Sequence, residues 1–221
     1  MPDALMDAAG LALPAPAPPA AIPFVLPQPD WLQTTLTLTG PADTVAAFRT
    51  AAAGAGVVPW ATDYDRLEED WFHLLIAPPP QRRGLSLHGA RILARRLREA
   101  AWAQHEEAVS RVGASRACPF DLHALVPVPP EILRLGDDHK QALVWLWENW
   151  GTTWPLRRVE ALPTPGEATF RVRFWSADWT PWPALARIRV RWPDLRLKAR
   201  PAYWSPESHG SALDQRAAQL R

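Results

Sequence analysis

An alternation of apolar and polar residues runs through residues 31–39. Leu32, Leu36 and Leu38 fall on one side of this segment, and a glutamine and threonines lie between them. This period of two is typical of a half-buried β-strand. A helix is predicted over about residues 43–53, because Asp43 can cap its start and glycines follow its end.

The pattern changes several times between residues 57 and 112. We expect a short strand over 57–61, a solvated acidic loop from Asp63 to Asp70, and an apolar strand over 71–77 that a run of prolines stops. Residues 85–112 predict the longest helix, with Ser86 as its N-cap and apolar residues at a spacing of 3.6.

The second half of the chain predicts an order of strand, helix, strand, strand, helix and strand. The strands are expected at 120–126, 156–162, 168–175 and 195–203, and the helices at 138–149 and 183–191. This βαββαβ order is that of a ferredoxin-like sandwich. The predicted fold class is therefore α+β, with a mostly antiparallel sheet and helices on one face. Residues 31–126 fit a similar order, so two pseudo-repeated units are an open alternative.

Four segments are predicted along the chain. Residues 1–30 are rich in alanine and proline, which favours a disordered or extended tail. Residues 31–117 would form an N-terminal α+β unit that includes the long arginine-rich helix, and residues 118–204 the ferredoxin-like unit. Residues 205–221 are expected to be a second tail.

Composition excludes few functions, but it indicates the cellular compartment and the kinds of partner to expect. The formal net charge is +1, so a nucleic-acid or membrane role would need a local patch of charge. The single cysteine, Cys118, cannot form an intrachain disulfide and fits a reducing compartment. The sequence has no apolar stretch of about 18 residues, the length expected of a membrane-spanning helix. We therefore expect a cytoplasmic protein with no membrane partner.

Motifs for catalysis are missing from the sequence. It contains no serine-hydrolase elbow, phosphate-binding loop or dinucleotide fingerprint. The six histidines show no short spacing suited to a metal. We therefore predict a protein that is not an enzyme, with no catalytic residue, no metal and no cofactor.

Tryptophan is concentrated in two runs, at residues 145–154 and 174–182, which hold seven of the 13 tryptophans. One interpretation is an aromatic cluster that fixes a helix to the sheet edge, with Glu148, Asn149 or backbone carbonyls accepting the indole protons. The other is a groove for a ligand or partner, because aromatic residues are enriched at interfaces. The candidate cluster consists of Trp147, Trp150, Trp154, Trp175, Trp179 and Trp182.

Basic residues alternate with apolar ones in the strands predicted over 168–175 and 195–203. The apolar side should face the helices, which leaves five basic side chains on the other face. RNA-recognition modules use this face of a sheet to bind single strands. A solvated strand face, or burial against the N-terminal half or a partner, are the alternatives. The candidate binding face consists of Arg171, Arg173, Arg196, Lys198 and Arg200.

Three motifs resemble those of a known family. They lie at residues 120–129 (F-x-x-x-x-x-x-P-x-P), 149–154 (N-W-G-T-T-W) and 174–181 (F-W-S-A-D-W-T-P). Together they resemble the Api-like family of plasmid and phage proteins, which share a ferredoxin-like domain of unknown function. Thr153 stands where that family has lysine, Asp178 marks an insertion or a shift in the third motif, and Trp182 replaces a second proline. The resemblance implies a fold and a mobile-element context, but no reaction.

These observations predict a non-catalytic accessory protein of a mobile genetic element, either a plasmid or a phage. It would act as a protein-interaction module, with a protein partner of unidentified kind. The alternative is a nucleic-acid-binding module that uses the basic face of the ferredoxin-like sheet.

Overall fold

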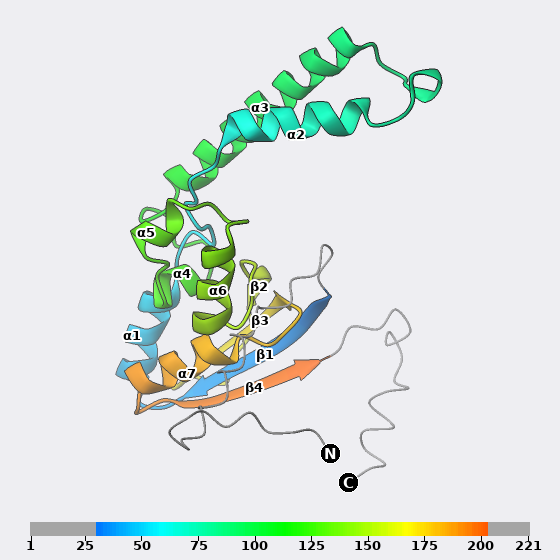
Figure 1. Cartoon of the computed structure of the whole chain (residues 1–221). Helices are drawn as coiled ribbons and strands as arrows, with labels where there is room; N and C mark the ends of the chain where they lie inside the picture. The colour runs from blue at the N-terminus through cyan, green and yellow to red at the C-terminus, as the bar shows by residue number, and fades with distance from the viewer. Residues whose placement is uncertain (1–29, 203–221) are drawn as a thin grey trace, which may run out of the picture.

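The structure, a computed structural model, describes residues 30–202 (Figure 1). In this range the chain has an α+β fold with a four-stranded sheet in which all neighbouring strands are antiparallel. The predicted class and the antiparallel sheet are therefore confirmed. Both predicted tails lie outside the described residues, apart from Asp30. The strands are β1 (Trp31–Thr39), β2 (Arg157–Ala161), β3 (Thr169–Ala177) and β4 (Arg196–Ala202).

Seven α-helices and one 3₁₀-helix complete the described part of the chain. They are α1 (Ala42–Ala52), α2 (Tyr64–Ile76), η1 (Pro80–Arg82), α3 (Leu87–Ser110), α4 (Leu122–Leu125), α5 (Pro130–Leu133), α6 (Lys140–Asn149) and α7 (Trp182–Arg191). Helices α1, α3, α6 and α7 were predicted within two residues at each end, as were β2, β3 and β4.

The strand order in the sheet is β2-β3-β1-β4. β1 pairs with β3 over its whole length and with β4 on its other side. Every second residue of β1 and β3 is buried, and these residues face the helices that cover one side of the sheet (Figure 1). In the core between them, Phe48 of α1 packs edge-to-face on Phe170 at 5.4 Å, and Phe120 stacks on Phe174 at 5.5 Å. The opposite face of the sheet is called the open face below.

The strand predicted over 120–126 is wrong, because residues 122–125 form α4. Asp121 caps this turn by accepting a hydrogen bond from the backbone N–H of His123 at 2.8 Å. Leu122 and Leu125 are both buried, so the apolar spacing that matters is three rather than two. The strand expected here is supplied by β1, and strands from both predicted units therefore share one sheet.

The acidic loop and strand predicted over 63–77 are also wrong, because these residues form α2. Asp63 caps the helix through the backbone N–H of Arg66 at 3.0 Å. The apolar run at 71–76 is short enough to fit either a strand or a helix, and packing against α3 decides in favour of a helix. Residues 57–61, also predicted as a strand, form none.

Helices α2 and α3 lie side by side and project from the sheet and its covering helices (Figure 1). No residue of α2 is buried, and only Ala90 and Ala94 of α3 are. A pair of helices with no third layer can bury little apolar surface. This pair, residues 64–110, is called the arm below.

Candidate nucleic-acid interface

The sheet register places all five predicted basic residues on the open face. Thr37 of β1 lies between Arg171 of β3 and Lys198 of β4. In the next row, Thr35 lies between Arg173 and Arg200. Arg196 follows opposite Thr39. Basic side chains thus flank a threonine stripe on both sides, as the alternation in the sequence predicted for β3 and β4.

Few acidic groups neutralise these charges within residues 30–202. Glu160 of β2 forms an ion pair with Arg173 at 2.7 Å. Arg171 donates to the backbone carbonyl of Pro163 at 3.3 Å. Among the described residues, no carboxylate forms an ion pair with Arg196, Lys198 or Arg200. This part of the face therefore carries a net positive charge that an anionic ligand can meet.

Aromatic side chains lie at one end of the same face. Arg157 of β2 pairs in register with Trp175 of β3, and its guanidinium carbon lies 4.2 Å from the centre of the Trp31 ring. These three side chains and Arg158 line a pocket of about 310 Å³. Arg158 has a positive φ of 47°, at an irregularity in the β2–β3 register. Backbone strain of this kind is often found at binding sites.

Sequence reasoning missed Trp31, Arg157 and Arg158 as site residues. Trp31 shares its face with Gln33 and Thr35 by the period of two, so it could have been placed once β1 was known to lie beside β3. Arg157 could not have been placed on this face from the sequence, because the register irregularity in β2 breaks the alternation.

The predicted tryptophan cluster is distributed over several places. Trp150 is in the core at 1% exposure, and its indole N–H donates to the carbonyl of Val126 at 2.9 Å. Trp147 meets Trp179 edge-to-face at 6.4 Å, which links the two runs. Trp175 lies instead in the open-face pocket, and Trp154 lies near it, 5.7 Å from the guanidinium of Arg157.

Exposure separates the members of this cluster further. Trp179 and Trp182 are 57% and 52% exposed. Trp182 is the first residue of α7, and Trp179 lies shortly before it. Trp150 is thus the member of the cluster that lies in the core, with a backbone carbonyl as the acceptor of its indole N–H. The exposed rings of Trp179 and Trp182 leave apolar surface beside the start of α7.

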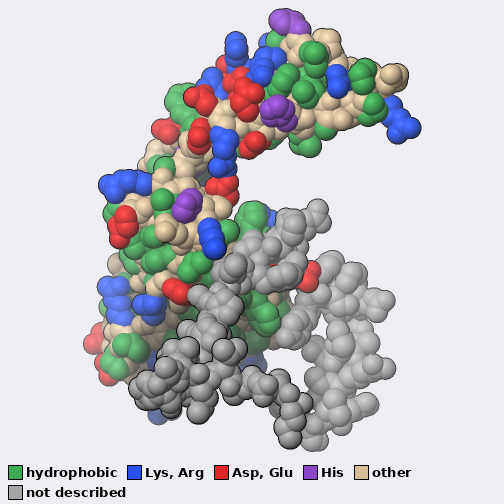
Figure 2. Space-filling view, in the orientation of Figure 1, with side chains coloured by type: hydrophobic (Ala, Val, Ile, Leu, Met, Phe, Trp, Pro, Cys, Tyr) green, Lys and Arg blue, Asp and Glu red, His purple; other side chains and the backbone are tan. Residues whose placement is uncertain are grey.

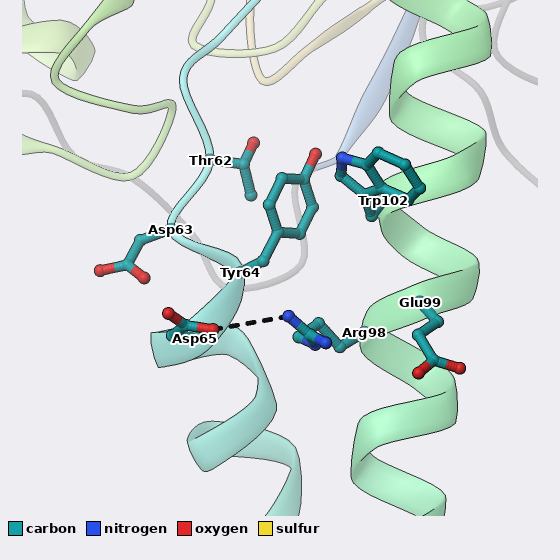
Figure 3. Close-up of a pocket in the computed structure, with 7 residues that line it drawn as sticks. All are labelled: Thr62, Asp63, Tyr64, Asp65, Arg98, Glu99 and Trp102. Carbon is teal, nitrogen blue, oxygen red and sulfur yellow. Dashed lines mark ion pairs between the residues drawn. The ribbon is translucent and has the colours of Figure 1, made fainter.

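A second hollow lies at the base of the arm (Figure 3). It has a volume of about 540 Å³ and is lined by α2 and α3, with Tyr64 on one side and Trp102 on the other. Arg98 points across it and forms an ion pair with Asp65 at 3.5 Å. The Tyr64 hydroxyl is buried and has no hydrogen-bond partner among the described residues.

The arginines of the long helix are largely paired within the arm. Arg91 binds Glu69 at 2.5 Å, and Arg98 binds Glu68 at 3.0 Å. Arg95 also reaches Glu68, at 4.0 Å. Figure 2 shows the resulting mixture of acidic and basic side chains along the arm. The arm is therefore a poorer candidate for binding a polyanion than the open face is.

Cys118, Asp121 and His123 lie together near the start of α4. The Asp121 carboxylate accepts hydrogen bonds from the backbone N–H groups of Gly56 at 2.9 Å and His123 at 2.8 Å. The His123 Nδ1 atom accepts one from Val128 at 3.2 Å, and burial lowers the pKa of this histidine. Burial raises the pKa of the Cys118 thiol, which disfavours the nucleophilic thiolate. These contacts fix loops to one another.

Comparison with known proteins adds one structural similarity. No family model matches the chain, and no curated protein matches it. Among solved structures, the chain is similar to the crystal structure of a protein api92 from Yersinia pseudotuberculosis, of family model DUF1281. The identity is 13%, the TM-score is 0.45, and the match covers 83% of this chain and 92% of that one.

In residues 30–202, no three His, Cys, Asp or Glu side chains are grouped so as to hold a metal ion. None of the helices in this range combines the length and the apolar character needed to cross a bilayer.

Proposed function

We propose that the open face binds single-stranded nucleic acid. The observation that carries this proposal is the row of basic side chains on β3 and β4, on both sides of the threonine stripe of β1. Alternate residues of a strand are about 6.8 Å apart, so the face offers charges at regular intervals along a backbone. Contacts to phosphates supply most of the affinity in such complexes, and threonine hydroxyls can add hydrogen bonds.

A simpler explanation of basic residues in a strand is that they protect the edge of a sheet from pairing with other chains. This explanation accounts for the residues of β4 but not for those of β3. Lysine and arginine on an edge strand prevent pairing with other chains, and β4 is at the edge of the sheet within the described residues. β3, however, is an interior strand between β2 and β1. Arg173 has a cross-strand partner in Glu160, but no carboxylate among the described residues forms an ion pair with Arg171. Arg171 therefore needs another explanation, and ligand binding provides one.

The arrangement of elements supports a more specific fold. We propose that β1, α1, β2, β3, α7 and β4 form a ferredoxin-like unit, with residues 53–156 inserted between α1 and β2. The strand order β2-β3-β1-β4, antiparallel throughout, supports it. The open face of such a four-stranded sheet is the one that RNA-recognition modules use.

Fluorescence anisotropy with a labelled oligothymidine, titrated with salt, tests nucleic-acid binding. The expected result is binding at low salt, with log Kd rising linearly with log salt concentration. Reversal of Arg171, Arg196 and Lys198 to glutamate should weaken binding more than tenfold and reduce the salt slope. The control variant reverses Arg95 and Arg96, which are on the arm, and should bind normally. Equal affinity in both variants would overturn the proposal.

A second candidate function is protein interaction through the arm, as an accessory protein of a plasmid or phage. It is favoured by large apolar side chains that the arm leaves exposed, with Leu74 at 70%, Trp102 at 54% and Ile92 at 46% exposure. The hollow beside Trp102 could receive a partner side chain that also gives the Tyr64 hydroxyl an acceptor. Buried aromatic anchors of this kind dominate binding energy at interfaces.

Paired variants distinguish the two functions. If the arm binds a protein partner, Trp102→Asp in the full chain should abolish co-purification of that partner. The same substitution should leave the affinity for oligothymidine unchanged. Reversal of Arg171, Arg196 and Lys198 should have the opposite effects. A partner retained by Trp102→Asp and by Leu74→Asp would exclude the arm as its binding site.

A further inference from the structure

The end of the open face carries a group of side chains that phosphate binding alone does not explain. Trp31 and Trp175 come from the two central strands, and Arg157 comes from β2. A basic face that only attracts phosphates needs no aromatic rings. Proteins that hold single strands add such rings because a nucleobase can stack on them.

We infer that this pocket holds one nucleobase of the bound strand, stacked on Trp175 and on the guanidinium of Arg157, with an adjoining phosphate on Arg158. The inference rests on the proposed function, since it assigns to the bases a place on the same face. Arg157 and Trp175 are partners in register, and the guanidinium already lies 4.2 Å from the Trp31 ring centre. Aromatic rings and guanidinium planes are the two surfaces on which proteins stack unpaired bases.

Size and position fit a single base. The pocket has a volume of about 310 Å³, at the lower end of the range for small-ligand sites. Its walls are the two indole rings and the two arginines, so apolar surface and positive charge occur together. The rows of basic side chains begin next to it, since Arg173 is two residues before Trp175 on β3. A strand that follows the basic rows would therefore reach the pocket with one of its bases.

The test compares two labelled probes of equal length and charge, oligothymidine and an abasic strand with the same backbone. Stacking should make oligothymidine bind about 5- to 100-fold more tightly. Trp175→Ala should remove this difference, and Trp175→Phe should keep most of it. Affinity for the abasic strand should stay the same in both variants, which also checks that the face is folded. Trp102→Ala on the arm is the matched control and should change neither affinity.

Each outcome decides a separate claim. Equal binding of the two probes by the unmodified protein would overturn the base site and leave phosphate binding by the open face in place. A preference for oligothymidine that survives Trp175→Ala would also overturn it. If neither probe binds at low salt, the proposed function fails and the base site with it. A preference that persists at high salt, while both affinities fall, supports stacking, because stacking releases no counterions.

Discussion

A Cβ atom added to Gly151 would lie 2.4 Å from the Cδ atom of Pro183. Gly151 follows α6 with a φ of +80°, and Pro183 is in the first turn of α7. The two helices can therefore approach each other here only because residue 151 has no side chain. Gly151 belongs to the first tryptophan run and Pro183 directly follows the second, so this contact joins the two segments at one helix junction.

Gly151→Ala should lower the free energy of unfolding by about 2–4 kcal/mol, from the positive φ and the steric overlap together. Urea unfolding followed by circular dichroism measures the loss. Gly113→Ala is the control for backbone strain alone, since its φ is +80° but nothing lies within 4 Å of the added atom. Gly166→Ala has neither problem and should be nearly neutral. Equal losses at 151 and 113 would show that the contact with Pro183 is unimportant.

Trp150→Phe should destabilise the protein by about 2–4 kcal/mol. The smaller ring leaves a cavity, and the Val126 carbonyl loses the indole N–H that donates to it at 2.9 Å. Thermal unfolding should show a clear fall in Tm. Trp182→Phe serves as the control, because this side chain is 52% exposed and should change Tm little. A similar effect of the two substitutions would contradict the core role of Trp150.

Stability should fall on acidification through His123. Burial lowers the pKa of this histidine below its ordinary value of 6.5, so the neutral form is favoured in the folded state. Its contribution to stability is therefore present above pH 6.5 and is lost as the pH falls toward and through the lowered pKa. Protonation of Nδ1 would also remove the acceptor for the Val128 N–H.

His123→Asn isolates this effect, since the amide oxygen can accept the same hydrogen bond without titrating. The free energy of unfolding, measured between pH 7.5 and pH 5, should fall more steeply in the unmodified protein than in the variant. Parallel pH profiles would show that His123 is not responsible. His88→Asn, on the outer surface of α3, should leave the steeper profile unchanged.

Glu68→Gln should loosen the arm without unfolding the sheet. The carboxylate is only 14% exposed and reaches three arginines of α3, which are Arg91, Arg95 and Arg98. A partly buried, shared carboxylate contributes more than a single surface pair, which is worth about 0–1 kcal/mol. Hydrogen exchange should therefore become faster in residues 64–110 and stay unchanged in β1 and β3. Glu106→Gln, near the end of α3, is the control.

The sequence was most informative where one local pattern decides the structure. The alternation in β3 and β4 predicted both the strands and the side of the sheet on which Arg171 and Arg196 lie. Capping by Ser86 and the long period of 3.6 predicted α3. In these segments the local signals of spacing and capping agree with the final structure, so no distant contact is needed to choose between alternatives.

Prediction failed where distant contacts decide. The apolar run at residues 71–76 fits a strand by length, and it is helical because it packs on α3. Residues 122–125 looked like the next strand of an alternating segment, but the Asp121 cap and the core favoured a short helix. The pocket with Trp31 and Arg157 could not be predicted from the sequence, because it depends on which strands are neighbours in the sheet.

The central position of β1 has a consequence for folding. The strands that pair with β1 are synthesised late, since Thr39 pairs with Thr169, which lies 130 residues further along the chain. Contacts of such long sequence separation fold slowly because a large loop must close first. During synthesis, the apolar side of β1 therefore leaves the ribosome long before β3 and β4 can cover it. We expect refolding to be limited by sheet closure and accompanied by aggregation at high concentration, whereas the arm, built from contacts local in sequence, forms early.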